Sequence, residues 1–215
     1  MTQPRNHDPP LDTQNRAVAP ADTVEGCRKA WAEIDNWAFN LVHPASREGT
    51  KELQATKDAI DAEPDMPQGY VSPMFGKFLS IQARLVKATH ILEVGTLGGY
   101  SAIWMATEVP DAHITTIEYS PTHAEVARRN IENTGLSDRI TVLEGAALDV
   151  LPRLEQEVQE GKRERFGMTF IDADKHNNYR YCEYAVKLSY PGACILVDNW
   201  YASSNFVGSE RAWLM

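Results

Sequence analysis

The sequence has few cysteines, no long apolar run and no excess of basic residues. Three widely spaced cysteines in 215 residues argue against a disulfide framework and against a thiolate zinc site. No apolar run approaches the roughly 20 residues of a membrane helix, and the polar N-terminus lacks the pattern of a secretory signal. The 21 basic residues face 30 acidic ones, which argues against nonspecific binding to nucleic acid or anionic membrane. We therefore expect a soluble, cytoplasmic protein.

The length and the 43% hydrophobic content suit one globular domain. Residues 1–22 lack periodicity and large apolar residues, which predicts a disordered tail. The rest is predicted to be a single domain in three parts: helices within 24–87, an α/β core over 88–199 and a short C-terminal segment, 200–215. Apolar residues at helical spacing predict helices on both sides of a break at His43-Pro44, and a further helix after Ser72-Pro73.

Five short apolar runs, which begin 23 to 28 residues apart, indicate strands at 91–94, 114–117, 140–143, 168–171 and 194–197. Each gap has room for one helix; residues 121–134, for example, place alanines and an isoleucine on one helical face. Strands that alternate with helices in this way are typical of repeated βαβ units. The sequence therefore predicts an α/β, doubly wound, mostly parallel sheet with helices on both faces.

A glycine-rich segment follows the first predicted strand, and residues 93–101 read Glu-Val-Gly-Thr-Leu-Gly-Gly-Tyr-Ser. In a doubly wound sheet, ligands bind beyond the carboxyl ends of the strands. The glycines permit a tight turn and close approach of a ligand, and the next helix offers free N–H groups. Leu97 and Tyr100 occupy places where the dinucleotide fingerprint requires glycine. The segment is either a ligand-binding loop or a simple turn.

An acidic residue, Glu118, follows the second predicted strand, 20 residues after Gly98. A carboxylate at this place can accept hydrogen bonds from both ribose hydroxyls of an adenosine-containing ligand. Tyr119, next to it, is placed to pack on a base. The alternatives are a solvated loop carboxylate and a surface aromatic ring.

Two aspartates follow the fourth and fifth predicted strands, Asp172 and Asp198, and Asn199 comes next. If these strands are neighbours, the carboxylates lie about 5 Å apart and repel by roughly 3 kcal/mol at an effective dielectric near 20. A shared proton, a lysine or a divalent cation would offset this repulsion, and the all-oxygen ligand set suits Mg²⁺ or a similar ion. Alternatively, Lys175 pairs with one of the acids and no metal binds. Beside a bound cation, Lys175 could instead act as a proton-accepting amine.

The six histidines carry little signal, because none has a ligand-like partner at helical spacing. His123 lies near a predicted helix start, and His176 is the one nearest to the predicted acidic site. We expect structural or surface roles for them. A Gly-x-Ser-x-Gly elbow is also absent from the sequence.

Taken together, these motifs resemble the small, cation-dependent O-methyltransferases that use S-adenosylmethionine, the family of catechol and caffeoyl-coenzyme-A O-methyltransferases. The resemblance runs from about residue 71 to residue 199, and five ordered segments carry it: Val-Ser-Pro-Met-Phe-Gly-Lys-Phe-Leu, Ile-Leu-Glu-Val-Gly-Thr-Leu-Gly-Gly-Tyr-Ser, Thr-Ile-Glu-Tyr, Phe-Ile-Asp-Ala-Asp-Lys and Leu-Val-Asp-Asn. It implies a Rossmann-like methyltransferase fold and methyl transfer to a hydroxyl of a catechol-like aromatic molecule. A homodimer is typical of microbial members.

The resemblance also implies roles for individual residues. The glycine segment through Ser101 would hold the methionine part of the cofactor, Glu118 the ribose, and Ala146 and Ala147 would lie beside the adenine. The implied cofactor-binding set is Glu93, Gly95, Thr96, Gly98, Gly99, Tyr100, Ser101, Glu118, Tyr119, Ala146, Ala147 and Asp172. The implied metal ligands are Asp172, Asp198 and Asn199, and the implied catalytic residues are Asp172 and Lys175, with Lys175 deprotonating the acceptor.

The sequence departs from this family at its C-terminus. Members continue after the Asp-Asn pair through a helix and an antiparallel hairpin of two strands, whereas 16 residues remain here. We therefore expect the hairpin to be missing, with the fifth strand as an exposed edge. Two other hypotheses stay open: a catalytically incompetent, truncated methyltransferase that binds the cofactor or a full-length partner, and a nicotinamide-dependent oxidoreductase.

Overall fold

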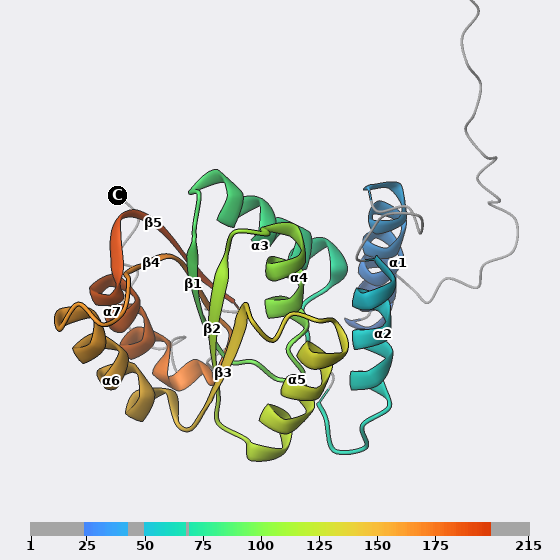
Figure 1. Ribbon diagram of the computed structural model, residues 1–215. Coiled ribbons are helices and arrows are strands. Elements are labelled where there is room, and N and C mark those ends of the chain that lie inside the picture. Colours follow the sequence, from blue (N-terminus) through green and yellow to red (C-terminus); the bar gives the residue numbers. More distant parts are fainter. Residues whose placement is uncertain (1–23, 43–49, 68, 199–215) are drawn as a thin grey trace, which may run out of the picture.

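The computed structural model describes residues 24–42, 50–67 and 69–198, and its centre is one parallel sheet (Figure 1). The sheet has the order β3-β2-β1-β4-β5, with all neighbours parallel. Its strands are β1 (His90–Val94), β2 (His113–Glu118), β3 (Ile140–Glu144), β4 (Phe166–Ile171) and β5 (Ser189–Val197). Each predicted apolar run lies within one of these strands. The predicted parallel α/β sheet is therefore confirmed.

Helices cover both faces of the sheet (Figure 1). One face carries α3 (Pro73–Leu85), α4 (Tyr100–Glu108) and α5 (Pro121–Asn133), and the other carries α6 (Ala147–Gln159) and α7 (Asn178–Leu188). Outside the first layer lie α1 (Val24–Val42) and α2 (Thr50–Asp61). The buried side chains form two clusters, one on each face. Because β1 and β4 are neighbours, the chain changes faces between them and leaves a crevice at their carboxyl ends.

Local sequence signals fix the start of α3. Ser72 is its N-cap, and the Ser72 side chain accepts a hydrogen bond from the Phe75 backbone N–H at 3.2 Å. Pro73 occupies the first helical position, as predicted. The Ser72 hydroxyl also donates to Asp35 Oδ1 on α1 at 2.8 Å, which ties the outer helix to the inner layer.

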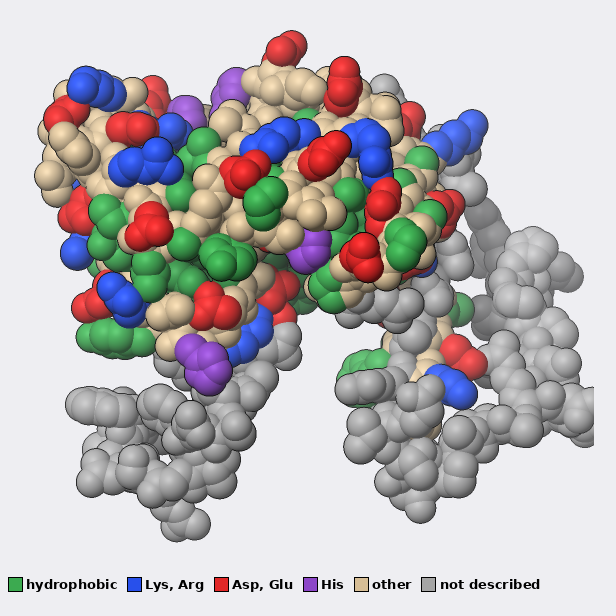
Figure 2. Space-filling model, turned by 90° about the horizontal axis from the view of Figure 1, so that it is seen from below, with side chains coloured by type: hydrophobic (Ala, Val, Ile, Leu, Met, Phe, Trp, Pro, Cys, Tyr) green, Lys and Arg blue, Asp and Glu red, His purple; other side chains and the backbone are tan. Residues whose placement is uncertain are grey.

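The sequence expectations for both ends of the chain lie outside the described residues. These are the disordered tail at 1–22, the metal ligand Asn199, the segment 200–215 and the missing hairpin. Within the described part of the chain, no helix is long and apolar enough to span a membrane. Figure 2 shows basic and acidic side chains interspersed on one face of the molecule.

Candidate active site

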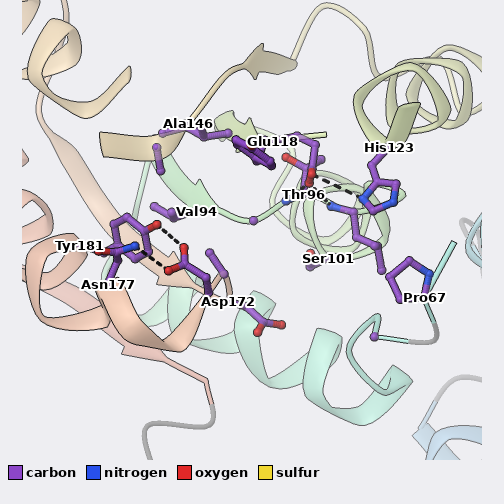
Figure 3. A pocket seen from close by; sticks show the side chains of 18 of the residues that line it. Pro67, Val94, Thr96, Ser101, Glu118, His123, Ala146, Asp172, Asn177 and Tyr181 are labelled. Carbon is purple, nitrogen blue, oxygen red and sulfur yellow. Dashed lines mark hydrogen bonds and ion pairs between the residues drawn. The ribbon is translucent and has the colours of Figure 1, made fainter. Parts of the chain in front are cut away.

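A cavity of about 630 Å³ lies at the carboxyl ends of β1 to β4, in the crevice that the topology creates (Figure 3). This volume falls within the range of small-molecule sites, about 300–1,000 Å³. The cavity brings together nine of the predicted site residues: Gly95, Thr96, Tyr100, Ser101, Glu118, Tyr119, Ala146, Ala147 and Asp172. The other described ones are not among its lining residues: Glu93, Gly98, Gly99, Lys175 and Asp198.

The glycine loop between β1 and α4 passes very close to two neighbouring segments. Gly95 has a φ of +100°, and a Cβ atom there would lie 2.1 Å from the Asp172 carbonyl oxygen. A Cβ atom on Gly98 would lie 2.3 Å from Ile60 Cγ1 on α2. Glycine is therefore required at both positions by sterics, and at Gly95 also by backbone conformation. Leu97 adopts a left-handed φ of +50° within the same loop.

Glu118 fixes the conformation of this loop. Its Oε2 atom accepts hydrogen bonds from the backbone N–H groups of Thr96 at 3.1 Å and Leu97 at 2.8 Å. Its Oε1 atom accepts one from the Ser120 N–H at 2.9 Å and lies 3.5 Å from His123 Nδ1. A carboxylate offers about four acceptor positions, so these three N–H groups leave capacity for a ligand hydroxyl. This arrangement fits the predicted ribose-binding role, which stays a prediction.

Behind the loop, Glu93 is fully buried in a polar network. The Thr116 hydroxyl donates to Glu93 Oε2 at 2.6 Å and lies 2.6 Å from the Thr96 hydroxyl. Burial raises the pKa of Glu93 to about 7, although hydrogen bonds from Ser101 and Thr116 act in the opposite direction. Glu93 therefore supports the loop from beneath and does not line the cavity.

Asp172 joins the cavity to the predicted metal site. The Asp172 N–H donates to the Val94 carbonyl at 2.8 Å, and the Asp198 N–H donates to the Ile171 carbonyl at 2.9 Å. The aspartates therefore follow neighbouring strands, β4 and β5, as predicted, at equivalent register positions. Lys175 Nζ lies 2.7 Å from Asp172 Oδ1. The pairing that the sequence left open as an alternative to a metal is thus present.

The predicted metal ligands are only partly described. Asp172 and Asp198 supply carboxylate oxygens, the donor type that Mg²⁺ prefers, whereas Asn199 lies outside the described residues. Among the described residues, no cluster of three or more His, Cys, Asp or Glu side chains is placed to hold a metal. The donor chemistry fits a divalent cation, and its binding stays a prediction.

The sequence analysis did not identify a polar cluster beside the cavity, formed by Asp174, Asn177 and Tyr181. Asp174 accepts hydrogen bonds from the Tyr181 hydroxyl and from Asn177 Nδ2, the latter at 2.6 Å. Burial and the bond to Asp174 both raise the pKa of Tyr181, which keeps its hydroxyl protonated. Figure 3 shows Asn177 and Tyr181 on the side of Ala146, across from His123. Their spacing of four residues at a helix start was the available signal.

Two further lining segments carried no usable signal. His123, which we expected to have a structural or surface role, lines the cavity beside Glu118 (Figure 3). Pro67 and residues 69–71, which precede α3, form another part of the wall. Their place depends on how α2 and α3 pack, and local sequence does not reveal such packing.

Comparison with known proteins identifies the family of the chain. The sequence model of the O-methyltransferase family matches residues 45–211. The chain is 45% identical over 180 residues to O-methyltransferase imqG of Aspergillus flavus, a match that covers 84% of this chain and 72% of that protein. It is 48% identical over 139 residues to the catechol O-methyltransferase of Niastella koreensis, across 64% of this chain and 61% of that protein.

Among solved structures, the O-methyltransferase from Bacillus cereus in complex with S-adenosylhomocysteine superposes with a TM-score of 0.69 and 38% identity. This match covers 84% of the present chain and 80% of the Bacillus chain. The shared fold is Rossmann-like, and the family assignment argues against a nicotinamide-dependent oxidoreductase. The chain belongs to the family of S-adenosylmethionine-dependent O-methyltransferases.

Proposed function

We propose that the chain transfers the methyl group of S-adenosylmethionine to a hydroxyl of a catechol-like aromatic molecule, assisted by a divalent cation. One observation carries the proposal: Asp172 contacts both the glycine loop, where the cofactor would bind, and Lys175, beside which the acceptor would bind. Its carbonyl oxygen abuts Gly95 in the glycine loop, and its carboxylate pairs with Lys175. A cofactor in the loop and an acceptor beside Lys175 would therefore be neighbours. The name of the Niastella relative supports a catechol acceptor.

Nine of the twelve residues expected to hold the cofactor line one cavity. The loop from Gly95 to Ser101 would bind the methionine part, Glu118 the ribose, and Ala146 and Ala147 the adenine. S-adenosylmethionine, when bound, supplies a methyl group that its sulfonium has already activated. The protein's task is to hold the acceptor oxygen about 3 Å from that methyl group, in line with the bond that breaks.

The acceptor must lose a proton as it attacks. We assign this proton to Lys175 Nζ, beside Asp172, acting as a neutral amine, the form that a cation bound at Asp172 would favour. Asp172, Asp198 and Asn199 would hold the cation, preferably Mg²⁺, and a cation there would make a bound hydroxyl more acidic and fix its position. Because Lys175 already contacts Asp172 Oδ1, the cation and the ammonium group would compete for this carboxylate.

Incubation of the purified chain with S-adenosylmethionine, catechol and Mg²⁺ tests the proposal. We expect a mono-methylated product by mass spectrometry, and none after removal of divalent cations with EDTA. Undiminished activity in EDTA would remove the cation from the proposal. Cofactor binding without methylation of a panel of catechols would favour the alternative, a catalytically incompetent binding protein.

We further propose a homodimer. Helix α1 exposes four apolar side chains at helical spacing, and each retains between 57% and 71% of its accessible surface: Trp31, Ile34, Trp37 and Leu41. An apolar stripe of this kind marks a protein contact more often than a free surface.

The interspersed charges in Figure 2 favour a small-molecule substrate over nucleic acid. A cytoplasmic location stays a prediction.

A further inference from the structure

The C-terminal turn of α2 contacts two segments that surround the cavity, the glycine loop and the residues before α3. Ile60 is buried and packs directly against Gly98 in the glycine loop. Asp61, the last residue of α2, accepts a hydrogen bond from the Tyr70 hydroxyl at 2.8 Å between Oδ1 and Oη. Tyr70 itself lines the cavity. Helix α2 therefore holds both the loop and the segment before α3.

A lysine completes the contact between α2 and Tyr70. Lys57 Nζ lies 3.2 Å from Asp61 Oδ2, one turn earlier on the same helix, and 5.8 Å from the centroid of the Tyr70 ring. A carboxylate at the C-terminal end of a helix meets the negative end of the helix dipole, and the Lys57 ammonium offsets this cost. Burial raises the pKa of Tyr70, and the bond to Asp61 raises it further, so the phenol remains a donor.

The Tyr70 ring contacts the start of α4. Its centroid lies 5.5 Å from that of Tyr100, with the planes at 61°. Tyr100 is buried, packs in turn on Trp104 and begins the helix that follows the glycine loop. The hydroxyl of Tyr70 is thus held by α2, and its ring closes the wall of the cavity beside the first turn of α4.

We propose that Tyr70 is a positioning residue for the cofactor, held in place by Asp61 and Lys57. The bond to Asp61 keeps residues 69–71 against the cavity, so the wall is formed before the cofactor arrives. Its loss would let this segment move outward and speed cofactor release, while Asp172 and Lys175 stay in place. The inference rests on the proposed function, because it requires that the cavity bind the cofactor.

Two variants test this inference against a matched control. Tyr70→Phe keeps the ring and removes the hydroxyl. Asp61→Asn removes the negative charge of the carboxylate that both Lys57 and the Tyr70 hydroxyl contact. Asp58→Asn is the control, because Asp58 lies on the same helix and accepts from Gln54 at 2.7 Å. The readouts are the Kd of S-adenosylhomocysteine by calorimetry, amide exchange at residues 69–71, and kcat and KM for S-adenosylmethionine.

For Tyr70→Phe we expect a Kd and a KM about tenfold higher, faster exchange at residues 69–71 and an unchanged kcat. Asp61→Asn should shift the same quantities in the same direction, and Asp58→Asn should leave them unchanged. The double variant should bind about as tightly as Tyr70→Phe alone, because Tyr70→Phe removes the hydrogen bond that Asp61→Asn only weakens.

Several outcomes overturn the inference, and they differ from failure of the proposed function. If the unmodified chain does not bind S-adenosylhomocysteine, the proposed function itself fails. If it binds and both variants match it in Kd and exchange, Tyr70 has no positioning role. A fall in kcat at constant KM would place Tyr70 in the chemical step instead. Should Tyr70→Phe unfold in a thermal scan, Asp61→Asn, on the outer helix, decides the question.

Discussion

Lys175 Nζ lies 2.7 Å from Asp172 Oδ1. The proposed proton acceptor therefore contacts Asp172, the residue that lies between the glycine loop and the proposed acceptor site. The side chains are 24% and 21% exposed, so the pair is partly buried. We expect the pair to act in catalysis, and a thermal scan of each variant shows whether the fold is kept.

Replacement of Lys175 by alanine should reduce kcat at least about 100-fold, the usual contribution of a positioned acid or base. The Kd of S-adenosylhomocysteine should change little, because Lys175 does not line the cavity. Steady-state kinetics and calorimetry measure the two quantities. Lys187→Ala is the control. Lys187 on α7 pairs with Glu155 on α6 at 3.8 Å, and neither residue lines the cavity. Equal losses in kcat and cofactor affinity would make Lys175 structural.

Glu118→Gln should weaken binding of S-adenosylhomocysteine by about tenfold or more, because hydrogen bonds to a charged group contribute about 1.5–3 kcal/mol. Glu144→Gln supplies a closely matched control. Glu144 is the register partner of Glu118 on β3, yet it pairs with Arg128 on the outside of the cavity. Calorimetry on both variants decides. Equal affinity of the Glu118 variant and the unmodified chain would exclude the ribose role.

Gly95→Ala should destabilise the fold more than Gly135→Ala. Both glycines have positive φ values, +100° and +68°, so both substitutions incur a conformational cost of about 1–2 kcal/mol. A Cβ atom at Gly135 would meet nothing within 4 Å, whereas at Gly95 it would meet the Asp172 carbonyl at 2.1 Å. Chemical denaturation measures the difference. Equal losses of stability would show that the backbone at Asp172 can move away from the added methyl group without a measurable cost.

Glu93 should make the protein less stable as the pH rises. Its pKa of about 7 in the folded state exceeds the ordinary 4.5, so between these values the folded protein keeps a proton that the unfolded chain releases. The free energy of unfolding therefore falls as pH increases through this window, by at most about 3 kcal/mol.

In Glu93→Gln this decrease should be absent. Denaturant unfolding at pH 5 and pH 8 measures it, with Glu125→Gln on the exposed side of α5 as the control. The same pH dependence in the Glu93 variant and the unmodified chain would assign the effect to other groups.

The stripe on α1 should govern self-association. Trp31→Glu combined with Trp37→Glu places charges in the proposed contact and should convert a dimer into a monomer in light scattering after gel filtration. Val186→Glu is the control, because Val186 is 66% exposed on α7, on the other side of the sheet. A monomeric unmodified chain, or a dimer that survives the double change, would contradict the proposal.

Local sequence was sufficient for most of the framework. Apolar runs located the five strands of the described sheet, and Ser72-Pro73 located the start of α3, because caps and periodicity act over a few residues. The beginning of β5 at Ser189 was missed, since Pro191 and Gly192 interrupt the apolar pattern. Proline is tolerated there because β5 is an edge strand of the described sheet.

Interactions between near neighbours along the chain were enough to predict the parallel α/β sheet and the loops in which the site residues lie. The complete fold was needed to show that Lys175 pairs with Asp172, that Tyr181 and Asn177 bind Asp174, and that Tyr70 contacts Asp61. The reason is physical: periodicity and capping depend on neighbours along the chain, whereas these contacts depend on which loops and helices the complete fold brings side by side.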